Sequence, residues 1–273
     1  MITYPYAKLN LGLFVTGKRH DGYHNIETVL VPLTSLCDIL EIVPGPLQSE
    51  SIRFTHSGLP IECDESENLC IKAYELMSQR VELPKVVIHL HKQIPIGAGL
   101  GGGSADGAFT LSMLNTMASR PLSATDLHSI ALNLGSDCPF FLMDTPCFAT
   151  GRGEMLEPLD LNLKGLYVVL VNPGISISTG YAYSHVRPQT ASFDLKRIVT
   201  IPLEQWRNQV SNDFEKIVFS QYPEVEKIKN DLYALGAIYA SMSGSGSTIF
   251  GLFDSKPDIK ELFSNMFAQV YAI

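Results

Sequence analysis

Alternating apolar and polar residues near the start of the chain predict a β-strand with two different faces. Apolar side chains occupy every second position from Ala7 to Val15. Successive side chains of a strand point to opposite faces, so Lys8 and Asn10 are expected to share the other face with Gly12. A lysine on the polar face of a strand is usually a solvated surface residue, and the alternation alone gives Lys8 no other role.

Similar patterns predict both strands and helices along the rest of the chain. Further strands are expected at residues 25–31, 37–43, 51–55, 86–90 and 166–171. Three amphipathic helices are expected. The first begins at Leu69, with Ser66 or Asn68 as its N-cap. The other two cover residues 104–118 and residues 125–134, and Gly135 stops the last one. We place the change from an N-terminal domain, residues 1–155, to a C-terminal domain, residues 156–273, just before the strand at 166–171.

A glycine-rich loop lies between the strand at 86–90 and the helix from Ser104. It reads P-I-G-A-G-L-G-G-G-S-A from Pro95 to Ala105 and contains five glycines. Without a Cβ, the backbone can adopt positive φ angles and approach a ligand closely. A loop that runs into a helix start also gathers free N–H groups at the positive end of the helix dipole. The segment therefore predicts a phosphate site.

Two common phosphate motifs fit this loop poorly. A P-loop, G-x-x-x-x-G-K-S/T, fails because Gly103 stands where the lysine must be. Gly97, Gly99 and Gly102 satisfy a dinucleotide fingerprint, but residues 91–96, which include Pro95, separate them from the strand, and no βαβ unit with a closing acid follows. A turn without a ligand is a third hypothesis, although such turns rarely carry five glycines into a helix.

Composition and charge exclude several classes of function. A length of 273 residues, 45% of them hydrophobic, suits one large domain or two of ordinary size. The net charge of −8 disfavours a nucleic-acid partner, which requires a basic surface. We see neither a secretory signal nor a run of 18 apolar residues, so we expect a cytoplasmic protein without a membrane partner.

Cysteine and histidine spacing predicts neither a disulfide framework nor a metal site. The five cysteines are odd in number and lack C-x-x-C spacing, which indicates reduced thiols that mostly serve packing. The histidines lack the spacing that would place two ligands on one helix face. We therefore name no metal-ligating residue.

Six short segments, taken in order, resemble the GHMP kinase superfamily of galactokinase, homoserine, mevalonate and phosphomevalonate kinases. They are A-K-L-N-L at 7–11, D-G-Y-H at 21–24, the glycine loop at 95–105, L-G-S-D-C-P-F at 134–140, G-R-G-E at 151–154 and S-M-S-G-S-G-S at 241–247. D-G-Y-H and the triple glycine resemble one branch, the 4-diphosphocytidyl-2-C-methyl-D-erythritol kinases of the non-mevalonate isoprenoid pathway. The segment from Asn212 to Glu215 also resembles this family, and we interpret it as structural.

This resemblance implies an α+β, two-domain GHMP kinase fold. Its N-terminal domain would resemble domain 2 of ribosomal protein S5, its C-terminal domain would be ferredoxin-like, and the active site would lie in the cleft between them. The 241–247 segment would pack close to the phosphate loop. ATP would be bound by Pro95, Ile96, Gly97, Ala98, Gly99, Leu100, Gly101, Gly102, Gly103, Ser104 and Ala105.

Ser104 and Asp106 lie at the start of the helix that follows the loop. Ser104 is expected to be the helix N-cap, and the resemblance also implies a role for its hydroxyl near the ATP phosphates or their Mg²⁺. The chain has Ala105-Asp106-Gly107 where Ser-Asn-Ala is common in the family. An acid in the first helical turn suits the helix dipole but lies close to phosphates, so we expect Asp106 to face away from them.

The implied reaction transfers the γ-phosphate of ATP to the 2-hydroxyl of 4-diphosphocytidyl-2-C-methyl-D-erythritol, with Mg²⁺ assisting. The resemblance makes Asp137 the catalytic base and places Lys8 beside the transferred phosphate. Phosphoryl transfer has a loose transition state, so the protein mainly positions groups and neutralises charge. Lys8 within about 4–6 Å of Asp137 would keep the carboxylate ionised. On the residues alone, Asp137 could instead cap the next helix.

The resemblance also implies a cytosine site. Tyr23 would stack on the base, a contact worth about 1–3 kcal/mol, and His24 would bond to its edge. Tyr183 would be the second aromatic, with Tyr181 as a rival, and Asn10 is included among the substrate-binding residues. On the residues alone, the Asp-Gly pair before Tyr23 would simply make a hairpin turn.

Two alternative functions follow from the same residues. The first is a GHMP kinase that acts on mevalonate, homoserine or a sugar. The D-G-Y-H segment and the triple glycine argue against it, because those substrates offer no base to stack. A non-catalytic nucleotide-binding regulator would be expected to lack Lys8 or Asp137, and both are present.

Overall fold

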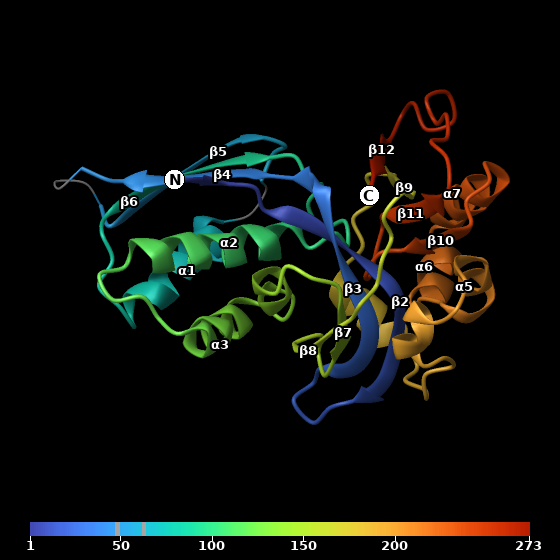
Figure 1. Ribbon diagram of the computed structural model, residues 1–273, viewed down its shortest axis with the longest axis horizontal. Coiled ribbons are helices and arrows are strands. Elements are labelled where there is room, and N and C mark those ends of the chain that lie inside the picture. The colour runs from blue at the N-terminus through green and yellow to red at the C-terminus, as the bar shows by residue number, and fades with distance from the viewer. Residues whose placement is uncertain (47–49, 62–63) are drawn as a thin grey trace. The chain divides into compact units, whose positions relative to one another are not determined.

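The computed structural model describes residues 1–46, 50–61 and 64–273 (Figure 1). Within these residues the chain forms two compact units whose segments alternate along the sequence. The first unit comprises Met1–Ala7, Leu36–Ile96 and Gly101–Asp144. The second comprises Lys8–Ser35, Gly97–Leu100 and Thr145–Ile273. Within the glycine loop, Gly97–Leu100 thus belongs to the second unit, and the residues on either side of it belong to the first. The single domain boundary at residue 155 stays a prediction.

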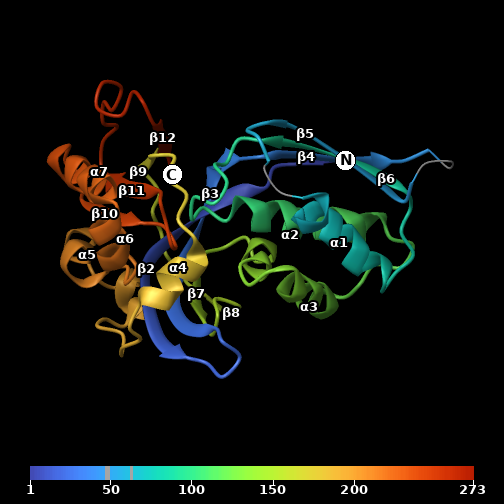
Figure 2. The ribbon, with the colours of Figure 1, turned by 180° about the vertical axis from the view of Figure 1, so that it is seen from behind.

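The first unit is a four-stranded sheet with helices along one face (Figures 1 and 2). The strand order is β1 (Ile2–Thr3), β4 (Ile39–Pro44), β6 (Val86–Lys92) and β5 (Ile52–Gly58). The helical elements are η1 (Glu65–Glu67), α1 (Leu69–Ser78), α2 (Gly102–Met117), α3 (Ala124–Leu134) and η2 (Cys138–Leu142). Alternate residues Val86, Ile88 and Leu90 of β6 are buried, as expected for a strand with one covered face.

The second unit contains two further four-stranded sheets. One has the order β10 (Tyr239–Met242), β11 (Ile249–Phe253), β9 (Tyr167–Asn172) and β12 (Phe267–Ala272). The other has the order β2 (Tyr6–Lys18), β3 (His24–Cys37), β7 (Cys147–Thr150) and β8 (Met155–Pro158). The first two residues of β2 and the last two of β3 belong to the first unit. The helical elements are α4 (Thr179–His185), η3 (Leu195–Val199), α5 (Leu203–Gln209), α6 (Glu215–Gln221) and α7 (Pro223–Ala234). Apolar residues of β9, β11, α6 and α7 form one buried core.

The predicted elements are confirmed, with differences at their ends. Asn68 caps α1 by accepting a hydrogen bond from the backbone N–H of Cys70 at 2.9 Å. The α2 helix begins at Gly102, two residues earlier than expected, because Gly101 is its N-cap with a φ of 70°. The α3 helix ends before Gly135 as expected, but this glycine is extended, with a φ of 176°, rather than left-handed.

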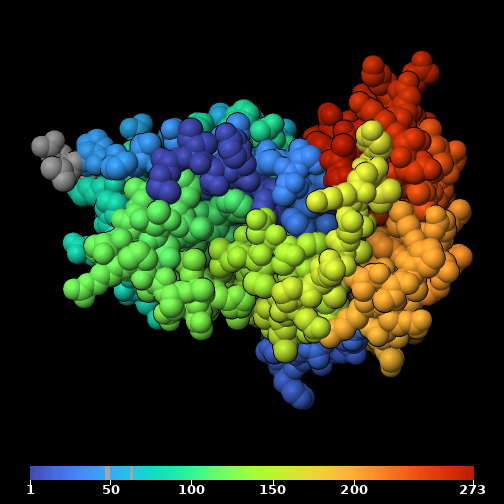
Figure 3. Space-filling view, in the orientation of Figure 1, coloured from blue at the N-terminus to red at the C-terminus, as the bar shows by residue number. Residues whose placement is uncertain are grey.

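The described cysteines are free, and no described helix is a candidate membrane span. Cys37, Cys70, Cys138 and Cys147 are free thiols, three of them buried, which confirms a packing role. Cys63 lies outside the described residues. No helix in the described part of the chain combines the length and the apolar character needed to cross a membrane. The N-terminal segment lies at the surface of the first unit (Figure 3), where Ile2 is 58% exposed.

A glycine in α2 allows three helices to approach closely, and it supplies a test of the fold. A Cβ on Gly107 would come within 2.7 Å of Leu134 Cδ2 and 2.9 Å of Leu69 Cβ. Alanine normally stabilises a helix by about 1 kcal/mol over glycine, whereas overpacking costs about 1–3 kcal/mol. We expect Gly107→Ala to lower the free energy of unfolding, measured by urea denaturation. The control Gly180→Ala, at an exposed α4 position, should not lower it, and a stabilised Gly107→Ala would contradict the packing.

Candidate active site

Lys8 is not a solvated surface residue but belongs to a buried hydrogen-bonded chain on β2 and β3. Its side chain is 4% exposed, and its Nζ donates to Asn10 Oδ1 at 2.5 Å. Asn10 Nδ2 donates to Thr28 Oγ1 at 3.0 Å, and the Thr28 hydroxyl donates to the carbonyl oxygen of Gly12 at 2.6 Å. A buried ammonium needs such partners because its desolvation is expensive. The chain of hydrogen bonds therefore sets the direction of the Lys8 side chain.

The first half of the glycine loop is held by the 241–247 segment, as predicted. Ser243 Oγ donates to the carbonyl oxygen of Gly99 at 2.9 Å, and it accepts from the backbone N–H of Asn10 at 3.3 Å. The backbone N–H of Lys8 donates to the carbonyl oxygen of Leu100 at 2.9 Å. Gly99 has a φ of +78°, and a Cβ there would collide with the Ser243 carbonyl oxygen. This close approach of two backbones requires glycine.

The second half of the glycine loop forms the start of α2 in the first unit. Gly101 has a positive φ, and a Cβ on Gly102 would lie 2.9 Å from both Ile94 Cγ2 and Lys92 Nζ. Gly103 is helical, unlike Gly101, and a Cβ on it would meet nothing within 4 Å, unlike one on Gly102. Neither backbone conformation nor packing requires glycine at this position. Open space beside the N–H groups of a first helical turn is what an incoming phosphate needs.

Ser104 lies in this same helical turn, and its hydroxyl faces Cys138, the residue after Asp137. The hypothesis that Ser104 is the N-cap is wrong, because Gly101 takes that position. The Ser104 hydroxyl lies close enough to the Cys138 thiol to lower the pKa of that thiol, against the effect of burial. Burial raises the pKa of Cys138 to about 12, and the charge of Asp137 adds to the rise. Asp137 does occupy the N-cap position of η2, but its side chain makes no capping hydrogen bond.

A buried cluster of three charged residues joins the strand before the loop to the helix after it. Lys92 Nζ donates to Asp38 Oδ2 at 2.5 Å and to Asp106 Oδ2 at 2.7 Å. Asp38 Oδ1 accepts from the backbone N–H groups of Gln93 at 2.5 Å and Ile94 at 2.9 Å. Asp106 therefore points into the interior of the first unit, and its facing away from the phosphates stays a prediction. All three charged side chains are at most 5% exposed.

The sequence interpretation missed Asp38 and Lys92 as parts of the site. A signal for Lys92 was present, because it continues the buried positions 86, 88 and 90 of β6 by another step of two. Burial alone would lower the pKa of Lys92, but the charges of Asp106 and Asp38 outweigh it, so the pKa is raised. Burial raises the pKa of Asp106 to about 7, although the charge of Lys92 opposes the shift. The other oxygen of Asp106, Oδ1, is buried without a hydrogen-bond partner.

The residues predicted to bind cytosine lie on the β2–β3 hairpin and on α4. The hairpin turn is present, with the Arg19 N–H donating to the Tyr23 carbonyl oxygen at 2.8 Å. Tyr23 is 53% exposed, and the guanidinium carbon of Arg152 lies 4.5 Å from its ring centroid. The rings of His24 and Tyr183 are stacked, with centroids 5.1 Å apart and planes at 26°. Burial lowers the pKa of His24, and the nearby charge of Lys18 adds to this, which favours the neutral imidazole.

This geometry separates the two tyrosines that the sequence left as rivals. Tyr183 contacts His24 and packs edge-on against Phe214 at 4.9 Å between centroids. Tyr181 instead lies against His185, with centroids 4.1 Å apart. Tyr183 is therefore the better candidate beside the D-G-Y-H segment, and its contact with a base stays a prediction.

The described residues contain no cluster of three or more His, Cys, Asp or Glu side chains that could hold a metal ion. His89 contacts the hydroxyls of Thr55 and Ser57, each at 2.9 Å, so it already has protein partners. Mg²⁺ in kinases is commonly held by one or two side chains together with substrate phosphates.

Comparison with known proteins shows which family the chain belongs to. The model for the GHMP kinases N terminal domain matches residues 68–152, and that for GHMP kinases C terminal matches residues 194–272. A Parabacteroides distasonis protein named 4-diphosphocytidyl-2-C-methyl-D-erythritol kinase is 48% identical over 98% of this chain and 97% of its own length. The chain belongs to this kinase family. A Bacteroides fragilis relative of the 4-diphosphocytidyl-2-C-methyl-D-erythritol kinase family is also 48% identical, over 96% of this chain and 95% of its own.

Solved structures agree with this family. The crystal structure of a 4-(cytidine 5'-diphospho)-2C-methyl-D-erythritol kinase matches with a TM-score of 0.79 and 34% identity, over 92% of this chain and 90% of its own. A mevalonate kinase from Methanococcus jannaschii, at 13% identity, a TM-score of 0.66 and coverage of 99% and 96%, shares the fold alone. The predicted α+β GHMP kinase fold is thus confirmed, and the chain is a phosphotransferase of the 4-diphosphocytidyl-2-C-methyl-D-erythritol kinase family.

The buried cluster predicts a pH-dependent contribution to stability. The pKa of an ordinary aspartate is about 4, and that of Asp106 in the folded protein is about 7. At a pH between these two values, Asp106 binds a proton in the folded state and not in the unfolded state. Its contribution to stability is therefore present at low pH and lost as the pH rises through 7. We expect the difference in free energy of unfolding between wild type and Asp106→Asn to fall from pH 5 to pH 8. Exposed Asp160→Asn is the control, and an unchanged difference would exclude Asp106 as the titrating group.

Proposed function

We propose that this chain transfers the γ-phosphate of ATP to the 2-hydroxyl of 4-diphosphocytidyl-2-C-methyl-D-erythritol, a step of the non-mevalonate isoprenoid pathway. The observation that carries this proposal is the match, over 98% of the chain, to a relative named for that reaction. The free thiols suit the reducing cytoplasm, where we propose that the reaction takes place.

ATP is proposed to bind at the glycine loop, with its phosphates against the first turn of α2. Gly103 supports this assignment, because the space beside it is not needed for folding. Mg²⁺ would neutralise charge on the phosphates, held by them and by the Ser104 hydroxyl. The chain has a net charge of −8, which would repel an anion such as ATP. The start of α2 offsets this repulsion, because it supplies a local positive potential.

The transfer itself is proposed to depend on Lys8 and Asp137. The 2-hydroxyl oxygen forms a bond to the γ-phosphorus, its proton passes to the Asp137 carboxylate, and ADP leaves as the bond to the β-γ bridging oxygen breaks. Lys8, oriented by Asn10, would offset charge on the transferred phosphoryl oxygens. Asn10 stays a predicted substrate contact, and its hydrogen bond to Lys8 gives it an orienting role besides.

The acceptor is proposed to bind through its cytosine at Tyr23, His24 and Tyr183. Tyr23 offers an exposed ring, and the lowered pKa of His24 favours a neutral imidazole, which can both donate and accept hydrogen bonds. Arg152 already lies against Tyr23, so a stacked base would meet a cation–aromatic pair rather than an isolated ring.

Asp137→Asn tests the proposed base. The amide cannot accept the hydroxyl proton, so kcat should fall about 10²- to 10⁴-fold while the dissociation constant for ATP changes little. The measurement is steady-state phosphorylation of the cytidine substrate with Mg-ATP, together with direct ATP binding. Exposed Asp144→Asn is the matched control, and a wild-type kcat in Asp137→Asn would remove Asp137 from the role of base.

Tyr23→Ala tests the proposed stacking. Loss of about 1–3 kcal/mol of stacking should raise the KM for the cytidine substrate about 5- to 150-fold and leave the KM for ATP unchanged. Tyr4→Ala removes a similarly exposed tyrosine and serves as the control. An equal rise in both KM values for Tyr23→Ala would be incompatible with a contact to the base.

A further inference from the structure

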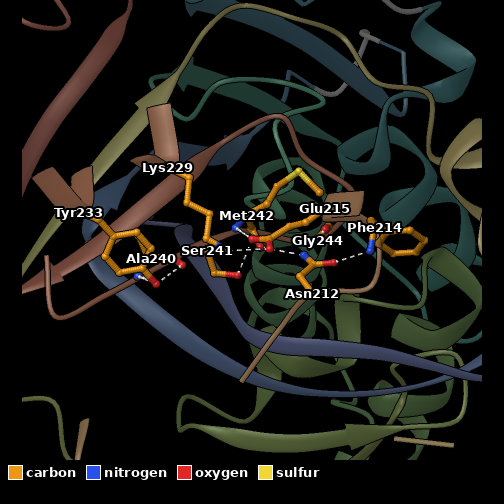
Figure 4. Close-up of polar contacts among 9 residues, drawn as sticks. All are labelled: Asn212, Phe214, Glu215, Lys229, Tyr233, Ala240, Ser241, Met242 and Gly244. Atoms are coloured by element: carbon orange, nitrogen blue, oxygen red, sulfur yellow. Dashed lines mark hydrogen bonds and ion pairs between the residues drawn. The ribbon is translucent and has the colours of Figure 1, made fainter. Parts of the chain in front are cut away.

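Asn212, which the sequence interpretation treated as structural, holds both ends of a short turn in the 241–247 segment. Its Nδ2 donates to the carbonyl oxygens of Met242 and Gly244, each at 2.8 Å (Figure 4). Its Oδ1 accepts from the backbone N–H of Phe214 at 3.0 Å. Asn212 is 3% exposed, so both N–H groups and the oxygen of its amide are used inside the protein.

The residue between the two carbonyl groups is Ser243, which contacts two parts of the candidate active site. Its hydroxyl donates to the carbonyl oxygen of Gly99 in the glycine loop at 2.9 Å. It also accepts from the backbone N–H of Asn10 at 3.3 Å. Asn10 in turn holds Lys8. A shift of Ser243 would therefore reach both the phosphate loop and the residue that orients Lys8.

The anchor itself is fixed on β2, the strand that carries Lys8. Leu13 donates its N–H to the carbonyl oxygen of Ser211 at 2.9 Å and accepts from the N–H of Asp213 at 2.8 Å. Asp213 Oδ2 accepts from the N–H of Val15, also at 2.8 Å. Asn212 thus joins β2 to the 242–244 turn.

Glu215 secures the strand that leads into this turn. Its Oε1 accepts from the Met242 N–H at 2.9 Å and from the Ser241 hydroxyl at 3.1 Å, and its Oε2 pairs with Lys229 at 2.6 Å (Figure 4). The turn also has backbone bonds, from the Ser243 N–H to the Thr248 carbonyl oxygen at 3.0 Å and from the Gly246 N–H to the Ser243 carbonyl oxygen at 3.1 Å. Glu215 does not reach Gly244 in the contacts above, and Asn212 is the side chain that binds the Gly244 carbonyl oxygen.

We propose that Asn212 is a positioning residue for phosphoryl transfer, acting through Ser243 on the Gly97–Leu100 backbone and on Asn10. The inference rests on the proposed function, because it concerns how that same site is held. Two carbonyl oxygens that face one side chain need two N–H donors on a single atom, which the amide provides. A carboxylate in the same place would present oxygen to both carbonyl groups and leave them unsatisfied.

The test compares Asn212→Asp, which keeps the shape and removes the donors, with Tyr233→Phe. The Tyr233 hydroxyl bonds to the backbone of Ala240 at 3.2 Å, at the other end of β10, so its loss should reduce stability without moving Ser243 (Figure 4). We expect Asn212→Asp to weaken ATP binding and to lower kcat/KM for ATP about 10- to 100-fold, as the loss of one or two buried hydrogen bonds would. Tyr233→Phe should stay within about twofold of wild type.

Ser243→Ala keeps the test decisive if Asn212→Asp does not fold. It removes the hydroxyl that contacts Gly99 and should change ATP binding and kcat/KM in the same direction. The double variant Asn212→Asp with Ser243→Ala should lose less than the sum of the losses in Asn212→Asp and Ser243→Ala, because both act through one contact. Wild-type ATP binding and kcat/KM in folded Asn212→Asp or in Ser243→Ala would overturn the proposal. If the wild-type enzyme fails to phosphorylate the cytidine substrate, the proposed function is overturned instead. Measurements of direct ATP binding distinguish the two outcomes, because they do not require the cytidine substrate.

Discussion

The ammonium of Lys92, buried between two carboxylates, is the interaction on which the start of α2 depends. Lys92 ends β6, Asp38 precedes β4, and Asp106 lies in α2, so one cation connects three elements of the first unit. Removing one partner from such a cluster costs about 3–5 kcal/mol, because a charge is left buried without compensation. Asp38 adds two backbone hydrogen bonds to the residues that follow Lys92. The chain therefore leaves the strand in a defined direction before it reaches the first glycine.

The glycine loop is held by different means in its two halves. Gly97–Leu100 packs within the second unit, where the Ser243 hydroxyl and the backbone of Lys8 bind its carbonyl groups. Gly101 onward belongs to the first unit, where the Lys92 cluster lies against Gly102. In both halves the protein binds carbonyl groups or fills space behind the loop. These contacts do not use the N–H groups of the first turn of α2, which supports the proposal that the ATP phosphates bind there.

The sequence predicted the elements, the glycine loop and the hairpin well, because each depends on local patterns. Alternation placed Lys8 and Asn10 on one face, but it could not show that the face is buried, since burial depends on partners such as Thr28 and Ser243 from distant segments. Ser104 was assigned as N-cap because the sequence does not reveal that Gly101 takes a positive φ. Asn212 could not be recognised as an anchor, because its carbonyl partners follow it by 30 and 32 residues.

Four glycines that look alike in sequence are present for four different physical reasons. Gly99 allows one backbone to approach another, Gly101 adopts a left-handed conformation, and Gly102 leaves room for Ile94 and Lys92. These three are consequences of folding and would be needed in any protein with this loop. Gly103 alone has an ordinary helical conformation and open space beside it. A glycine that costs helix stability without serving the fold supports the proposal that the ATP phosphates approach the backbone there.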